Sequence, residues 1–93
     1  MSNTIIEAFV NEYSDDCIPY YALEKLLDDN YDAVASTSEY NWVQQGKFNV
    51  ISNEPIDVSN FNYLIQKSGY TTRLKQKSEK KSGSSIRYNY VIA

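Results

Sequence analysis

Side chains that can bind phosphate gather in the last third of the chain. Residues 58–93 contain seven basic residues and one acid, Glu79, so their net charge is +6. Residues 1–57 contain two basic residues and eleven acids, a net charge of −9. Because a local field decides which partners a surface attracts, the total charge of −3 does not exclude a polyanionic partner for the basic third.

A short helix is expected at the start of this basic third. Four apolar residues recur there at the spacing of one helical face: Val58, Phe61, Leu64 and Ile65. Asp57 and Ser59 are both suitable N-cap residues. Gly69 is placed to end the helix, because glycine is the residue that most readily adopts the left-handed backbone of a C-terminal cap.

A β-hairpin is expected after this helix. Apolar and polar side chains alternate over residues 70–75 and again over residues 86–90, which is the period of half-buried strands. The segment between them, Ser78–Ser85, is small and polar, a composition typical of flexible loops. We therefore expect a loop that carries Lys80 and Lys81 at the tip of the hairpin.

Two further helices are expected nearer the N-terminus. Thr4 and Glu7 have the spacing of a capping box, and the amphipathic segment that they open reaches Tyr13. Pro19 suits the first turn of a second helix. The apolar face of that helix consists of Ala22, Leu23, Leu26 and Leu27.

Residues 33–56 have the weakest pattern. Ser36 is a candidate cap for a short helix that Gly46 would end, and residues 48–51 form a short strand or buried coil. Trp42 is expected to be a core residue, because a small domain depends on the burial of its large aromatic side chains.

The order of these elements predicts an α+β fold. Specifically, we expect a winged helix-turn-helix with three helices plus a C-terminal β-hairpin wing. A chain of 93 residues has the size of one domain, so residues 1–93 are assigned to a single winged-helix DNA-binding domain.

The third helix and the wing offer two kinds of contact. Asn and Gln can pair two-pronged with adenine in the major groove. The candidate DNA-binding residues of the recognition helix are Ser59, Asn60, Asn62, Tyr63, Gln66 and Lys67. The candidate DNA-binding residues of the wing are Arg73, Lys75, Lys77, Lys80, Lys81 and Arg87, among which Arg73, Lys75, Lys77 and Arg87 share one strand parity. The structural alternatives are a solvated helix face and lysines that protect a strand edge from pairing.

These residues resemble the C-terminal winged-helix domain of primase-helicases of the phage, plasmid and poxvirus type. The shared pattern is a Phe, a Leu three residues later, a Gly, an Arg and a basic hairpin. Here it is carried by Phe61, Leu64, Gly69-Tyr70, Arg73, the Lys-rich loop and Arg87-Tyr88-Asn89-Tyr90. IIEAFVNEY and CIPYYALEKLL look like the preceding helices, and Ala33–Ile56 looks like an insertion. The resemblance implies recognition of a replication origin, as in replication initiators of mobile genetic elements such as staphylococcal pathogenicity islands.

No catalytic constellation is apparent in the sequence. The chain has no His and a single cysteine, Cys17, which excludes His-based catalysis and zinc sites built from His or several Cys. The acids at residues 15–16 and 28–32 are interpreted as solvated helix-end charges rather than Mg²⁺ ligands. There is no GxxxxGK[ST] loop and no apolar run of ~20 residues. We expect a cytoplasmic protein that is not an enzyme and needs neither cofactor, metal nor membrane.

The functional hypothesis is therefore binding of double-stranded DNA for origin recognition. The resemblance implies either the C-terminal domain of a longer chain, with a helicase motor domain in the same full-length chain as a second partner, or a small stand-alone protein. One alternative is a winged-helix transcription regulator. The other is a phage-encoded inhibitor that binds a protein through the acidic surface of residues 7–32.

Overall fold

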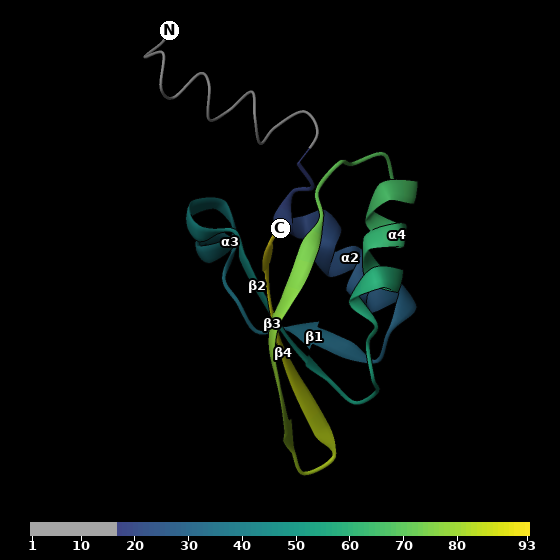
Figure 1. Cartoon of the computed structure of the whole chain (residues 1–93), viewed down its shortest axis with the longest axis vertical. Helices are drawn as coiled ribbons and strands as arrows, with labels where there is room; N and C mark the ends of the chain where they lie inside the picture. The colour runs from purple at the N-terminus through teal and green to yellow at the C-terminus, as the bar shows by residue number, and fades with distance from the viewer. Residues whose placement is uncertain (1–16) are drawn as a thin grey trace, which may run out of the picture.

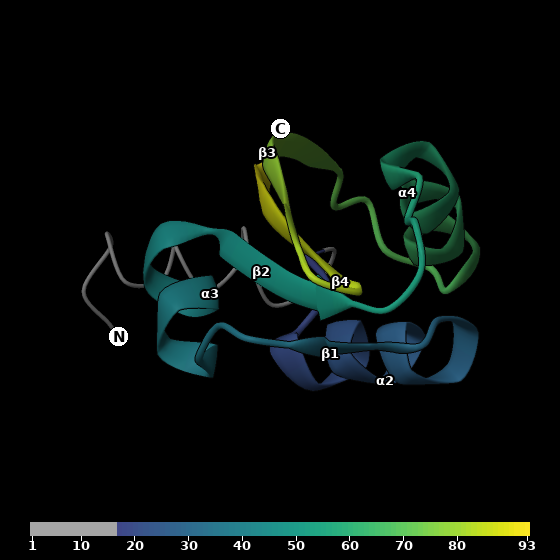
Figure 2. The same cartoon turned by 90° about the horizontal axis from the view of Figure 1, so that it is seen from below.

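A four-stranded antiparallel sheet, with two of the helices packed on one of its faces, organises the chain (Figures 1 and 2). The computed structural model describes residues 17–93, so the helix expected at Thr4–Tyr13 lies outside the described residues. The elements are α2 (Tyr20–Asn30), β1 (Ala33–Ala35), α3 (Glu39–Gln45), β2 (Lys47–Ser52), α4 (Val58–Lys67), β3 (Leu74–Ser82) and β4 (Ser85–Ile92). The strand order is β1-β2-β4-β3. The expected α+β class is confirmed.

Helices α2 and α4 follow local sequence signals. Helix α2 begins directly after Pro19, and its buried residues Leu23 and Leu27 stand one turn apart. At α4 the Asp57 carboxylate accepts a hydrogen bond from the Ser59 N–H (3.0 Å), which makes Asp57 the N-cap. The buried residues of α4 are Phe61 and Ile65, and the chain turns away through Ser68 and Gly69.

Residues 33–56, which look like an insertion relative to the resembled family, supply β1, α3 and β2 and are therefore an integral part of the sheet. Strand β2 lies between β1 and β4 and pairs with β4 along its whole length. Phe48 and Val50 are buried, and the Trp42 indole N–H donates to the Ile18 carbonyl (3.0 Å) in the core. The short helix exists as expected and ends at Gly46 (φ +64°), but its N-cap is Ser38 rather than Ser36.

The hairpin is longer and its turn tighter than the sequence predicts. Strands β3 and β4 are joined by a turn at Gly83 and Ser84, where Gly83 has a φ of +63° that favours glycine. Lys80 pairs with Arg87, and Lys81 with Ile86. The expectation that these two lysines lie in a tip loop is therefore wrong. In Figure 1 the distal part of the hairpin extends beyond the helices, which explains why most of β3 is exposed.

A β-bulge interrupts the pairing of β3 with β4. Gln76 pairs with Tyr90 and Ser78 with Asn89, so Lys77 is the extra residue on β3. From this point on, the side chains of β3 point to the faces opposite to those that simple alternation predicts. The sequence pattern therefore assigns the side chains of β3 to the correct face of the hairpin only for the residues that precede the bulge.

Stacked aromatic rings connect α4 to the centre of the sheet. The Phe61 ring stacks against Phe48 (centroids 6.3 Å apart, 10° between planes) and Tyr90 (6.4 Å, 29°). Tyr90 in turn stacks on Tyr88 at 5.7 Å. All four rings are at most 2% exposed. The core is therefore centred on contacts among β2, α4 and β4.

The two core tyrosines differ in how their hydroxyl groups are satisfied. The Tyr88 hydroxyl accepts a hydrogen bond from the buried Ile56 N–H (2.9 Å). The Tyr90 hydroxyl is buried and has no hydrogen-bond partner within residues 17–93. Burial also raises the pKa of Tyr90 above its ordinary value, because the charged phenolate would lose its hydration.

We expect Phe61→Ala to lower the free energy of unfolding by about 3–5 kcal/mol, because the substitution removes a fully buried ring and leaves a cavity. Urea denaturation followed by circular dichroism measures the change. Tyr63→Ala is the matched control on the same helix: its ring is 58% exposed, so the change should stay within about 0.5 kcal/mol. Equal effects of the two variants would contradict the assigned face of α4.

We expect Tyr88→Phe and Tyr90→Phe to have opposite signs. Tyr88→Phe leaves the buried Ile56 N–H without its acceptor and should destabilise the fold by about 1–3 kcal/mol. Tyr90→Phe removes an unpaired buried hydroxyl and should be neutral or stabilising by about 1 kcal/mol. Thermal and urea unfolding of the two variants in parallel test this, and a loss of stability in Tyr90→Phe would show that its hydroxyl is satisfied.

Candidate nucleic-acid interface

The two faces of the sheet differ in composition. The inner face, which α2 and α4 cover, carries buried residues such as Phe48, Val50, Tyr88 and Tyr90. The pairing register places the alternate residues on the opposite side, which we call the outer sheet face. On β2, β3 and β4 this face consists of Lys47, Asn49, Ile51, Lys75, Ser78, Lys80, Arg87, Asn89 and Val91.

Positive charge is concentrated on the outer sheet face. Lys75 and Lys47 flank Val91 on neighbouring strands, and Lys80 pairs directly with Arg87. The bulged residue Lys77 joins them, because it lines a hollow of about 330 Å³ together with Lys47, Asn49, Ser78, Asn89 and Val91. The face thus gathers five cations from three strands, and none of its residues on those strands is acidic.

The bulge at Lys77 produces this sorting of charge. Under simple alternation Glu79 would share a face with Lys75, and Lys80 would point to the inner side. The extra residue reverses both positions, so that Glu79 pairs with Tyr88 on the inner row and Lys80 stands beside Arg87. The only acid of residues 58–93 is thereby removed from the basic face.

The hollow contains polar groups held in place by hydrogen bonds. The Asn89 amide nitrogen donates to the Ser78 hydroxyl (2.6 Å), and the Asn49 main-chain N–H donates to the Thr37 hydroxyl (2.6 Å). Lysine amines beside these amides are suitable donors for phosphate oxygens. The arrangement is suited to bind anions.

Helix α4 presents a second hollow, of about 320 Å³. It brings together the predicted residues Ser59, Asn62, Tyr63, Gln66 and Arg73, with Tyr70, Thr71 and Thr72 completing the lining. Ser59, Tyr63, Gln66 and Lys67 are exposed, as a recognition surface requires. Most of the polar residues expected to point away from the core on this helix are therefore exposed, whereas Asn62 is only partly exposed.

The amide of Asn62 has a structural role that the sequence did not predict. Its nitrogen donates to the Leu74 carbonyl and its oxygen accepts from the Leu74 N–H, both at 2.8 Å. The side chain thereby pairs with the start of β3 as a neighbouring strand would. The two-pronged surface expected to contact adenine is engaged with the protein itself. Asn60 is engaged as well, since its amide nitrogen donates to the Tyr31 hydroxyl (2.6 Å).

The recognition helix and most wing cations lie on opposite sides of the sheet. Phe61 anchors α4 to the inner face through Phe48 and Tyr90, whereas Lys75, Lys77, Lys80 and Arg87 belong to the outer face. Of the predicted wing residues, Arg73 lines the hollow of α4, and Lys81 pairs with Ile86 on the inner row. The structure therefore divides the predicted interface in two.

Four polar residues of the outer sheet face are absent from the interface predicted from the sequence. Lys47, Asn49, Ser78 and Asn89 all line the 330 Å³ hollow. Lys47 stands in the acidic part of the chain, so a count of charge by region hides it. The available signal was the alternation of Lys47 and Asn49 with the buried residues Phe48 and Val50.

Comparison of the chain with protein-family models, with curated proteins and with solved structures found no match. Within residues 17–93, no three His, Cys, Asp or Glu side chains are grouped so as to hold a metal ion. None of the helices of this part of the chain has the length and apolar character needed to cross a membrane.

We expect Asn62→Ala to destabilise the domain by about 1–3 kcal/mol, because both polar groups of the buried Leu74 backbone lose their partner. Gln66→Ala, one turn further along the exposed side of α4, should change stability by less than about 0.5 kcal/mol. Urea denaturation measures both variants. A fully stable Asn62→Ala protein would show that the amide does not join α4 to β3.

Proposed function

We propose that this domain binds double-stranded DNA and that the outer sheet face provides the phosphate contacts. The observation that carries the proposal is the gathering of Lys47, Lys75, Lys77, Lys80 and Arg87 on one face with no acid among them. Neutralisation of phosphates by such cations releases counterions and supplies the sequence-independent part of DNA affinity.

The composition of the face favours a duplex over a single strand. Proteins that hold single strands stack the bases on exposed aromatic rings. The outer sheet face carries no aromatic residue on β2, β3 or β4, and its apolar members are Ile51 and Val91. Cations and amides without stacking platforms match the continuous phosphate backbone of a duplex.

The finer proposal is a winged-helix domain that recognises a replication origin. It is supported by α4 followed directly by the β3–β4 hairpin, by the strand order β2-β4-β3, and by the resemblance to the C-terminal domain of mobile-element replication initiators. A helicase motor fused upstream would distinguish this role from that of a transcription regulator with the same architecture.

Two triple variants with equal loss of charge test which side of the sheet contacts DNA. Lys47→Ala/Lys75→Ala/Lys80→Ala removes cations from the outer sheet face. Lys67→Ala/Arg73→Ala/Lys81→Ala removes the same charge from the side of α4. Each protein is titrated into a labelled duplex at several salt concentrations.

We expect the outer-face variant to lose affinity for all duplexes. The slope of log Kobs against log salt should fall by about 0.9 for each lysine that contacts a phosphate, and by about 2.7 if all three do. The variant on the side of α4 should keep the wild-type slope. A loss confined to that second variant would transfer the interface to α4, and wild-type binding by both would refute the proposal of DNA binding.

A further inference from the structure

The free edge of strand β1 is open to pairing with another strand. Strand β1 stands at one end of the sheet, so within residues 17–93 only β2 pairs with it. The Ser36 N–H donates to the Asn49 carbonyl, and the Asp32 carbonyl accepts from the Asn53 N–H. In an antiparallel ladder these contacts alternate along a strand. Ala33 and Ala35 therefore direct their main-chain N–H and C=O groups away from β2, toward the free edge.

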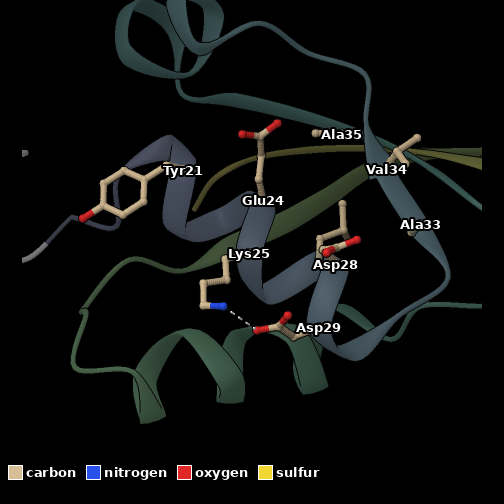
Figure 3. Close-up of a pocket in the computed structure, with 9 residues that line it drawn as sticks. Tyr21, Glu24, Lys25, Asp28, Asp29, Ala33, Val34 and Ala35 are labelled. Carbon is tan, nitrogen blue, oxygen red and sulfur yellow. Dashed lines mark ion pairs between the residues drawn. The ribbon is translucent and has the colours of Figure 1, made fainter.

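A groove runs between this edge and helix α2 (Figure 3). It has a volume of about 440 Å³ and is lined by Ala33, Val34 and Ala35 on one side and by residues of α2 on the other. Small side chains on β1 leave the main chain accessible. In Figure 2, α2 and β1 lie alongside each other, so the groove follows the direction of the strand.

The wall formed by α2 carries two carboxylates toward β1. Figure 3 shows Glu24 and Asp28 on the side of α2 near the strand, whereas Lys25 and Asp29 form an ion pair (3.2 Å) on the side away from it. Neither Glu24 nor Asp28 takes part in an ion pair within residues 17–93. Lys25 and Asp29 also line the groove, but their opposite charges offset each other, so the groove keeps the negative charges of Glu24 and Asp28.

We propose that an extended, Lys- or Arg-rich segment of a partner protein binds in this groove as an additional antiparallel strand on β1. The unpaired main-chain groups of Ala33 and Ala35 would hold the backbone of that segment, as in other cases of strand addition to a sheet edge. Side chains opposite these alanines would point to the same side of the sheet as theirs, where α2 lies.

The spacing of the acids matches that of an extended basic segment. Glu24 and Asp28 are one helical turn apart, which is about 6 Å along the axis of α2. Alternate residues of a strand are about 6.7 Å apart and point to the same side. Two cations at alternate positions of the bound segment would therefore each meet one carboxylate, and this charge complementarity selects a basic partner. DNA would be repelled by the same groove.

The groove and the outer sheet face are independent sites. Strands β1 and β3 occupy opposite ends of the sheet, and most cations of the outer face stand on β3 and β4. The binding of a basic segment at β1 therefore leaves the cationic surface accessible. Such a site would let the domain recruit a second protein while it contacts a polyanion.

The test uses the 93-residue chain and a fluorescein-labelled heptapeptide of alternating valine and lysine, with fluorescence anisotropy as the readout. In the proposed register the lysine amides face β1 and the valine amides face solvent. N-methylation of the lysine amides should weaken binding at least about tenfold, because it removes the main-chain hydrogen bonds. N-methylation of the valine amides, the matched control peptide, should leave binding unchanged.

Protein variants test the contribution of the groove. Glu24→Gln/Asp28→Asn should weaken binding of the unmodified peptide about fivefold, since both contacts are lost at an exposed site. Glu39→Gln/Glu79→Gln removes the same charge outside the groove and should bind the peptide as wild type does. Equal affinity of the two methylated peptides, or equal affinity of the two double variants, would overturn the proposal and leave only non-specific attraction between opposite charges.

Discussion

The stack of Phe48, Phe61 and Tyr90 is the contact on which the arrangement of this protein depends. It joins β2 and α4, which are neighbours in the sequence, to β4, which comes much later in the chain, and the three elements meet at the centre of the core. Hydrophobic stacking sets the distance between α4 and the sheet, but it does not fix the position of the helix along the sheet. The two hydrogen bonds between Asn62 and Leu74 fix that position, because hydrogen bonds are directional.

Once α4 is fixed, the sheet separates charge into distinct regions. The apolar core occupies the inner face where the helices cover it, so most cations of the strands lie on the outer sheet face. The bulge at Lys77 then places Lys80 with Arg87 and moves Glu79 away from them. At the other end of the sheet, α2 lines the edge of β1 with Glu24 and Asp28. A small domain with a net charge of only −3 thereby presents two surfaces of opposite sign.

Local signals predicted the elements, whereas contacts distant in the sequence decided their roles. The spacing of Phe61 and Ile65 and the cap at Asp57 identified α4, because helix periodicity and capping involve neighbouring residues.

The central position of β2 could not be predicted, since its partner β4 comes some forty residues later. The bulge could not be predicted from the alternation of apolar and polar residues, because β3 is polar on both faces where it extends beyond the helices. The residues predicted as one interface are divided between two sides of the sheet, because α4 packs on the inner face whereas most wing cations lie on the outer sheet face. Asn62 was predicted to be a surface residue, because its partner Leu74 comes close to it only in the folded structure.

The strand order also has a consequence for the time at which the chain can fold. Strand β4 is the last of the described elements, yet it lies inside the sheet and pairs with both β2 and β3. During synthesis β2 and α4 emerge well before the strand that completes their side of the core. Until then the rings of Phe48 and Phe61 lack Tyr90, and the inner face of β2 stays open to other chains. Completion of this side of the core therefore requires residues 85–92 to have left the ribosome, after which the hairpin can close locally and bring β4 to β2.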